Sequence, residues 1–349
     1  MIEVFGGMSR DRLSELLDKM RGVRVAVLGD ICLDVYWLAD MKRSELSRET
    51  PHFPLPVVEE RMSPGGGGNV AVNLAGLKPA KVFAIGVTGE DWRGAELLRL
   101  LVGNGVDAMH LIKTKGVVTN GYCKPLRAGI SQVVYEDPRI DFCNYSHISP
   151  ETEDAIIASL DEVAPQIDVL CVCDQLTYGI GTDRIRAHIT GLARAGLTVA
   201  VDSRNRIGSY RNAILKPNEL EGARAVGMEN LSNISDFAEA AVALARGTEG
   251  EVLMTLGLQG ALYTSGEAVT HFPANRVDGE IDIVGAGDTF LSGFSMAIAA
   301  GASRPEAAFF AALCSEVTIQ KLGCTGSASA EEVLSWHDRI NGKHQRNEE

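Results

Sequence analysis

The sequence predicts an α/β protein with a mostly parallel central sheet, helices on both faces of that sheet, and a small second β-sheet. Two observations lead to this prediction. From residue 151 onward, helical apolar patterns alternate with short β-branched runs, and that order is typical of a parallel sheet. Nearer the N-terminus, two regions instead alternate apolar and polar residues, as strands with one wet face do.

The central sheet is expected to begin with a strand at 24–30, an apolar run that ends in Gly-Asp. The glycine cluster 65–68 then leads into residues of helical spacing. In order, the pattern predicts a helix at 69–77, a strand at 81–86 and a helix at 90–102.

The second sheet is expected from the alternating patches 33–38 and 55–60, which a proline-containing polar stretch separates. A hairpin of strands 117–124 and 131–136, closed by residues 127–130, is expected to pair with them.

In the second half, helices and strands follow one another. Helices are predicted at 151–163, 182–195, 219–226, 235–247, 286–300, 305–321 and 330–340. Strands are predicted at 168–173, 197–202, 213–215 and 251–256, with 260–265 and 268–272 as an antiparallel edge. The last nine residues, 341–349, are polar and expected to fray.

The charge of the chain argues against binding to nucleic acid. With 46 acidic and 33 basic residues, the formal net charge is −13, so no basic surplus is present to neutralise phosphates. The same charge repels any phosphate-bearing ligand at long range. Local donors and a divalent cation would therefore have to supply the attraction.

Compartment and membrane signals are also informative. No apolar run approaches the roughly 18 residues that span a bilayer, and residues 1–12 show no secretion signal. The seven cysteines are scattered and match no zinc spacing. We therefore expect reduced thiols, a cytoplasmic location and no membrane partner.

The strongest motif is Asp-Ile-Val-Gly-Ala-Gly-Asp-Thr-Phe at 282–290, directly before a helical run. Gly285 and Gly287 permit a sharp turn that gathers backbone N–H groups at a helix N-terminus, where an anion is favoured. A carboxylate at Asp288 makes sense there if it accepts a proton during in-line phosphoryl transfer. The alternative is a turn in which Asp288 is only a helix N-cap.

Two other motifs have the residue types of a sugar site. The glycines of 65–68 permit close approach of the backbone, and Asn69 offers both a donor and acceptors for hydroxyl groups. Asp34 follows the first strand, near the edge where open α/β sheets bind ligands. The alternatives are a flexible loop and a surface or turn aspartate. At 218–221, Asn-Glu-Leu-Glu fits either a ligand site or a helix-capping box.

Read together, these motifs resemble a family. Gly-Asp-x-x-x-Asp at 29–34, Pro-Gly-Gly-x-x-Asn at 64–69, Asn-x-x-Glu at 218–221 and Gly-Ala-Gly-Asp at 285–288 occur in this order. The set is similar to the ribokinase-like (PfkB-type) carbohydrate kinases over roughly residues 22–340. The resemblance implies one ribokinase-like kinase domain over 1–349, with lid strands inserted at about 32–62 and 115–137. It also implies phosphoryl transfer from ATP to a sugar hydroxyl and a homodimer formed through the lid.

The resemblance gives each motif residue a role. The catalytic base would be Asp288, and the anion hole would be formed by Gly285, Ala286 and Gly287. The sugar-contacting positions would be Asp34, Gly65, Gly66 and Asn69. Magnesium would be positioned through water by Asn218 and Glu221, and the ATP phosphates would be bordered by Thr255, Gly257 and Gly260. A monovalent-cation site, with potassium as the candidate ion, would use Asp282 and the carbonyl of Val284.

Within that family, the chain most resembles the kinases of D-glycero-D-manno-heptose 7-phosphate. The matching segments are 27–37, 55–60, 139–142 and Lys-Leu-Gly-Cys-Thr at 321–325. It departs from that subgroup where Val35 follows Asp34, at 47–52 and after Asp174. A kinase for another sugar or nucleoside, and a non-catalytic sugar-binding regulator, remain alternatives. A Rossmann dehydrogenase is disfavoured because no Gly-x-Gly-x-x-Gly follows the first strand.

Overall fold

A computed structural model describes residues 2–323 and 326–347, the last five of these by backbone alone. Its main feature is a ten-stranded sheet in the order β1-β15-β14-β13-β12-β11-β10-β2-β5-β6. Pairing is parallel except for the two antiparallel pairs that β14 makes with β13 and β15. The fold is therefore the mostly parallel α/β sheet that the sequence predicts.

The elements of the sheet and its helices have the following bounds. The strands are β1 (Ile2–Val4), β2 (Arg24–Gly29), β5 (Lys81–Gly89), β6 (Asp107–Thr114), β10 (Val169–Asp174), β11 (Thr198–Ser203), β12 (Ile214–Leu215), β13 (Glu251–Thr255), β14 (Ala261–Thr264) and β15 (Val269–Phe272). The helices are α1 (Arg10–Met20), α2 (Gly67–Gly76), α3 (Trp92–Gly103), α4 (Pro150–Val163), α5 (Asp183–Arg194), α6 (Glu219–Val226), α7 (Ile234–Thr248), α8 (Ala286–Ala299), α9 (Arg304–Thr318) and α10 (Ala330–Asn347).

Helices cover both faces of this sheet, and successive strand residues point into different cores. On β10, Cys171 packs with α1, α2 and α8 to α10, whereas Leu170 and Val172 pack with α4, α5 and α7. This alternation follows from the two-residue period of a strand. A strand buried on both faces must be apolar throughout, which is why β10 has no polar residue before Asp174.

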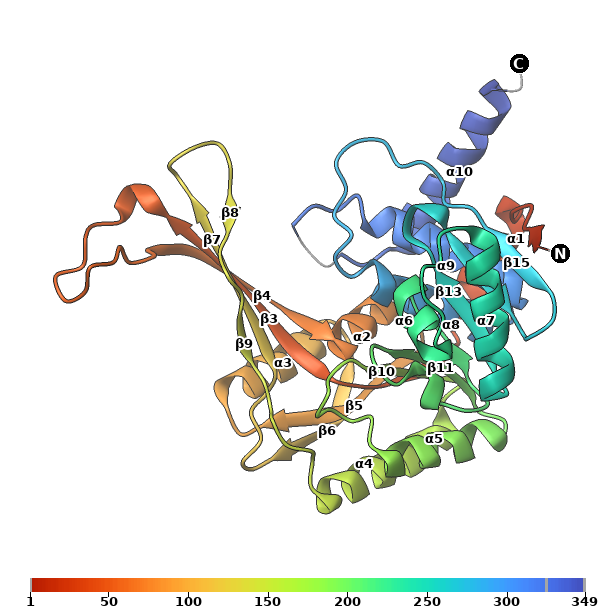
Figure 1. Ribbon diagram of the computed structural model, residues 1–349, viewed down its shortest axis with the longest axis horizontal. Helices are drawn as coiled ribbons and strands as arrows, with labels where there is room; N and C mark the ends of the chain where they lie inside the picture. The colour runs from red at the N-terminus through yellow and green to blue at the C-terminus, as the bar shows by residue number, and fades with distance from the viewer. Residues whose placement is uncertain (1, 324–325, 348–349) are drawn as a thin grey trace.

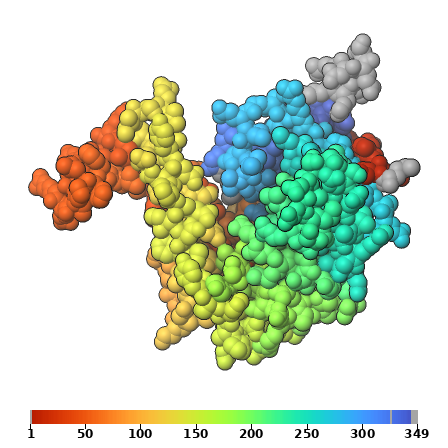
Figure 2. All heavy atoms as spheres, in the orientation of Figure 1, coloured from red at the N-terminus to blue at the C-terminus, as the bar shows by residue number. Residues whose placement is uncertain are grey.

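The second sheet contains β3 (Ile31–Asp40), β4 (Val57–Gly66), β7 (Gly121–Ala128), β8 (Tyr135–Glu136) and β9 (Ile140–Phe142). We call these strands and their connecting loops the lid. β3 pairs with β4 antiparallel and with β7 parallel, so the two alternating regions of the sequence do form one sheet. Figure 1 shows the lid extending away from the central sheet, and Figure 2 shows a hollow between its yellow strands and the blue C-terminal part.

Several sequence predictions need correction. The hairpin strand lies at 121–128 and not at 117–124, since the chain turns only at Gly129, where φ is +96°. The glycine cluster is not a loop, because Gly65 and Gly66 end β4 and the next two glycines begin α2. The pair at 261–272 is not the sheet edge, because β1 adds a parallel strand beside β15. Finally, α10 continues to Asn347 through most of the tail expected to fray, while residues 348 and 349 lie outside the described residues.

Three strands and one α-helix were not predicted from the sequence: β1, β6, β9 and α1. The six cysteines described are free thiols, whereas Cys324 and Thr325 of the Lys-Leu-Gly-Cys-Thr segment lie outside the described residues. Within the part of the chain that the structure describes, no helix is long and apolar enough to cross a membrane.

Candidate active site

Asp288 lies in the first turn of α8, where the predicted motif places it. Gly285 is the N-cap of that helix, with φ +80°, and provides no side-chain cap. The N-cap alternative for Asp288 is therefore wrong. Instead, its carboxylate accepts a hydrogen bond of 2.7 Å from Nδ2 of Asn69 on α2.

Helix α2 fixes that asparagine. Nδ2 of Asn73 donates to the side-chain oxygen of Asn69 at 3.2 Å, and this contact turns the Asn69 amide nitrogen toward Asp288. The side-chain oxygen of Asn73 in turn accepts a hydrogen bond of 2.9 Å from the Thr289 hydroxyl. The two asparagines one turn apart thus join α2 to α8 and orient the carboxylate.

The turn before α8 leaves backbone donors available. Ala286 N–H donates to the Ile283 carbonyl at 3.2 Å. Among the hydrogen bonds of the described residues, none uses the N–H of Gly287 or Asp288. Two free N–H groups at a helix N-terminus favour an anion, as the motif predicts.

A buried ion pair stands next to these donors. A Cβ built on Gly287 would lie 3.5 Å from Nζ of Lys216, so the ammonium group borders the turn. Lys216 pairs with Asp202 at 2.8 Å, and both side chains are nearly inaccessible. Burial alone would lower the pKa of Lys216, but the acidic groups of Asp202, Glu221 and Asp288 together raise it above its ordinary value. Lys216 is therefore a fixed positive charge at the turn, in a chain whose net charge is negative.

Sequence reasoning did not single out Lys216 or Asp202. Their only signals were position: Lys216 directly precedes Pro217 and the Asn-x-x-Glu motif, and Asp202 ends a predicted strand. Asp202 also accepts a 3.1 Å hydrogen bond from Nε2 of Gln175, which fixes it from the other side.

Asn218 and Glu221 form a capping box at the start of α6. The Asn218 side chain accepts from Glu221 N–H at 2.8 Å, and Oε2 of Glu221 accepts from Asn218 N–H at 2.9 Å. The helix-capping alternative is therefore confirmed, and a ligand role for the same two residues stays a prediction. Burial raises the pKa of Glu221. The charge of Asp202 adds to the rise, and the charge of Lys216 opposes it. Its Oε1 makes no hydrogen bond within the described residues, so this oxygen is free to face a ligand.

The predicted sugar-contacting residues meet where the lid joins the sheet. Asp34 on β3 is only 9% exposed, and a Cβ on Gly65 would lie 2.8 Å from its carboxylate. Gly66 has φ +55°, and a Cβ there would lie 2.4 Å from the Asp30 carbonyl. Only glycine permits this approach of the two backbones. Burial raises the pKa of Asp34, and the charge of Asp34 contributes to the raised pKa of Asp288.

The remaining predicted residues lie at two other places. Thr255 ends β13 beside Asn218, with which it forms an isolated bridge, and the tight turn Gly257–Gln259 follows. On the other side of the α8 turn, the Asp282 carboxylate accepts from Val284 N–H and Gly323 N–H, each at 3.0 Å. Among the described residues, no group of three metal-ligating side chains is assembled.

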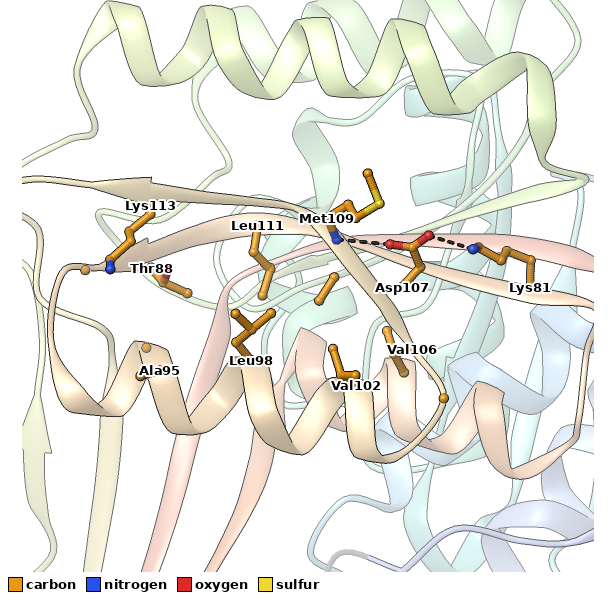
Figure 3. Close-up of a pocket in the computed structure, with 14 residues that line it drawn as sticks. Lys81, Thr88, Ala95, Leu98, Val102, Val106, Asp107, Met109, Leu111 and Lys113 are labelled. Carbon is orange, nitrogen blue, oxygen red and sulfur yellow. Dashed lines mark hydrogen bonds and ion pairs between the residues drawn. The ribbon is translucent and has the colours of Figure 1, made fainter.

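A separate pocket lies away from these residues. A cavity of about 730 Å³ opens between α3 and β6, and Figure 3 shows it bordered by Leu98, Val102 and Leu111. Its Lys81 and Asp107 pair with each other at 2.6 Å. None of the motif residues lines this pocket. Its middle is apolar, and the motif residues that carry the proposed chemistry lie outside it.

Comparisons with known proteins agree with this geometry. The family model described as pfkB family carbohydrate kinase matches residues 24–138 and 207–331. The bifunctional protein HldE of Hyphomonas neptunium is 33% identical over 334 residues, which cover 92% of this chain and 65% of that protein. HldE of Geotalea uraniireducens is 31% identical over 94% of this chain and 66% of its own length. The chain therefore spans just under two thirds of these relatives.

Solved structures show the same fold. Arabidopsis thaliana ribokinase, complexed with ribose and ATP, matches 90% of this chain and 98% of its own with a TM-score of 0.67 and 20% identity. Escherichia coli phosphofructokinase-2, in complex with fructose-6-phosphate, matches 91% of this chain and 99% of its own with a TM-score of 0.70 and 20% identity.

Proposed function

The chain belongs to the pfkB family of carbohydrate kinases, and from this premise we propose that it transfers a phosphoryl group from ATP to a hydroxyl of a sugar or sugar phosphate. One observation carries the proposal. The Asp288 carboxylate lies beside two free N–H groups and the Lys216 ammonium, so a base and an anion site share one turn. The family membership indicates which reaction this arrangement serves, because phosphoryl transfer needs both a base and a site for the anionic phosphoryl group.

The residues divide the chemistry as follows. Asp288 would accept the proton of the attacking hydroxyl, since burial raises the pKa of its carboxyl to about 7. The N–H groups of Gly287 and Asp288, with Lys216, would stabilise the charge on the transferred group. Asp34 and Asn69 would orient the sugar between the lid and α2.

The nucleotide would lie along the edge formed by Asn218, Thr255, Gly257 and Gly260. The free Oε1 of Glu221 suits the water shell of a magnesium ion, which neutralises phosphate charge when bound. Asp282 already accepts two backbone N–H groups, and its carboxylate together with the Val284 carbonyl would still offer oxygen ligands to potassium.

The lid indicates which substrate class fits. Asp34 and Tyr36 of β3 are register partners of Tyr122 and Lys124 of β7, so all four side chains share one lid face. Nζ of Lys124 lies 3.0 Å from the Tyr36 hydroxyl, and Lys124 makes no ion pair among the described residues. Arg139 lies 4.3 Å above the Tyr122 ring, held by Asp141.

Two cations therefore lie on the lid face that bears Asp34, and their charges oppose the rise that burial causes in its pKa. An uncharged sugar would form no ion pair with these cations, whereas the phosphate of a sugar phosphate could pair with Lys124 and Arg139. This favours a sugar phosphate as acceptor. Together with the sequence resemblance, it supports heptose 7-phosphate as the substrate to test first.

Coupled ADP release with Mg·ATP, measured over free sugars, sugar phosphates and nucleosides, tests the proposal. We expect turnover with a sugar phosphate, heptose 7-phosphate included. Lys124→Met should raise KM for that substrate about tenfold while kcat changes little. Turnover only with an unphosphorylated sugar would contradict the sugar-phosphate assignment and still support kinase activity. No ADP release with any compound of the panel would favour the non-catalytic sugar-binding regulator.

One kinase domain with an inserted lid stays our proposal, and the lid supports the further proposal of a homodimer. Large apolar side chains are exposed on the lid, and such exposure is typical of an interaction surface. They include Phe53, Val58, Ile130 and Val133. Pairing of two lids would cover them. The free thiols suit a reducing compartment, and we keep the cytoplasm as the proposed location.

A further inference from the structure

Residues 273–284 connect β15 to α8 without regular structure and join two parts of the proposed nucleotide site. At one end, a Cβ on Gly260 would lie only 1.9 Å from the Phe272 carbonyl, so the segment begins directly against that turn. At the other end, the segment runs into Gly285 and the free N–H groups of α8. Whatever holds this segment therefore sets the spacing between the two parts.

A buried carboxylate on α9 anchors the first part of the segment, while Asp282 N–H donates to the Ile319 carbonyl at 2.8 Å near the other end. Glu316 is 5% exposed, and its Oε1 accepts from Asn275 N–H at 2.8 Å and from Asn275 Nδ2 at 3.1 Å. Its Oε2 accepts from Asn275 Nδ2 at 3.0 Å and from Nε1 of Trp336 on α10 at 2.7 Å. Asn275 is thus attached by backbone and side chain to one carboxylate.

The chemistry of this contact is unusual for a core. All three donor groups are neutral, and no ion pair of Glu316 occurs among the described residues. Burying a carboxylate without a cation is costly, and an apolar side chain would join α9 to α10 more cheaply. A carboxylate is needed where every neighbour is a donor, as at Asn275 and Trp336.

We propose that Glu316 is a positioning residue for the nucleotide, because it fixes Asn275 and so holds residues 273–284 beside the Gly257–Gly260 turn. The inference rests on the proposed kinase function. Glu316 itself touches neither substrate. Its loss should therefore weaken nucleotide binding and leave the sugar side, at Asp34 and Lys124, unchanged.

The test compares Glu316→Gln with Glu306→Gln, the same change on the same helix. A glutamine at 316 sets an amide N–H against donors. Glu306 instead caps α9 and pairs with Arg12, and among the described residues it makes no hydrogen bond or ion pair to the segment 273–284. The probe is MgADP, titrated by calorimetry into the full chain. Hydrogen exchange of residues 273–284 is measured in parallel, together with KM for ATP and for the sugar.

We expect Glu316→Gln to bind MgADP about tenfold more weakly, with an unchanged sugar KM and faster exchange in the segment. Glu306→Gln should lower the melting temperature and leave the MgADP affinity unchanged. If Glu316→Gln fails to fold, Asn275→Ala takes its place, with a loss of about threefold expected. Wild-type affinity in the folded variant would overturn the inference alone. A wild-type chain that does not bind MgADP would overturn the proposed function, and this inference with it.

Discussion

At the scale of single residues, the surroundings of Asp288 determine how the reaction should depend on pH. Burial raises the pKa of its carboxyl to about 7; the charges of Asp202 and Asp34 add to the rise, while Asn69 and Lys216 oppose it. Only the deprotonated form can accept a proton. We therefore expect kcat/KM to rise about tenfold per pH unit below about 7 and then to level off. Initial rates from pH 5 to 9, with the coupling enzymes in excess, measure this. A flat profile down to pH 5 would contradict the base role.

The Lys216–Asp202 pair makes a prediction about stability. Lys216→Met leaves the Asp202 carboxylate buried without its cation, and we expect a loss of about 3–5 kcal/mol in the free energy of unfolding. Urea denaturation measures the loss. Adding Asp202→Asn should restore a large part of it, because the orphaned charge is removed. A single-variant loss below about 1 kcal/mol would show that the pair is well solvated.

Part of the site could be predicted from residues alone, because Asp288, Asn69 and Asn218–Glu221 sit in motifs whose spacing fixes their local geometry. Lys216 could not be, since its meaning depends on pairing between β11 and β12, which brings it to Asp202. Asp30 shows the opposite case. It looks like a ligand residue at a strand end, yet its carboxylate accepts three backbone N–H groups from the loop after β10.

At the scale of elements, the turn between β13 and β14 depends on one glycine. Gly260 has φ +88°, and a Cβ there would lie 1.9 Å from the Phe272 carbonyl. Gly260→Ala should therefore lower the free energy of unfolding by more than about 2 kcal/mol. Gly227→Ala is the control: φ is +68°, but a Cβ meets nothing within 4 Å, so only about 1 kcal/mol should be lost. Equal losses by urea denaturation would show that the clash relaxes away.

The helices and strands differ in how well the sequence predicts them. Helix α6 was predicted at its observed bounds, because a capping box and a C-terminal glycine mark both ends. The edge strand β6 was missed, since its outward side is solvated and Met109 there is 86% exposed, which breaks any alternation. Helix α1 had its signal in Ser9 and the spacing of Leu13, Leu16, Leu17 and Met20. The sequence therefore contained enough information to predict α1.

At the scale of the whole molecule, the projecting lid predicts self-association. Val133 is 55% exposed on the lid and would be covered in a lid-to-lid dimer. Val133→Asp should shift the molecule from dimer to monomer in light scattering after gel filtration, because a buried unpaired charge opposes association. Val102→Asp, at 58% exposure on α3, is the control and should remain dimeric. A monomeric wild type would contradict the lid interface.

We propose that one carboxylate at the start of α8 drives phosphoryl transfer to a sugar. This proposal is tested most directly by comparing Asp288→Asn with the wild type on the best acceptor of the panel, at saturating ATP and sugar. Asparagine keeps the shape and cannot take the proton, so kcat should fall on the order of 10²–10⁴-fold with KM for ATP little changed. Near-normal turnover by a folded Asp288→Asn variant would contradict the account and require another base.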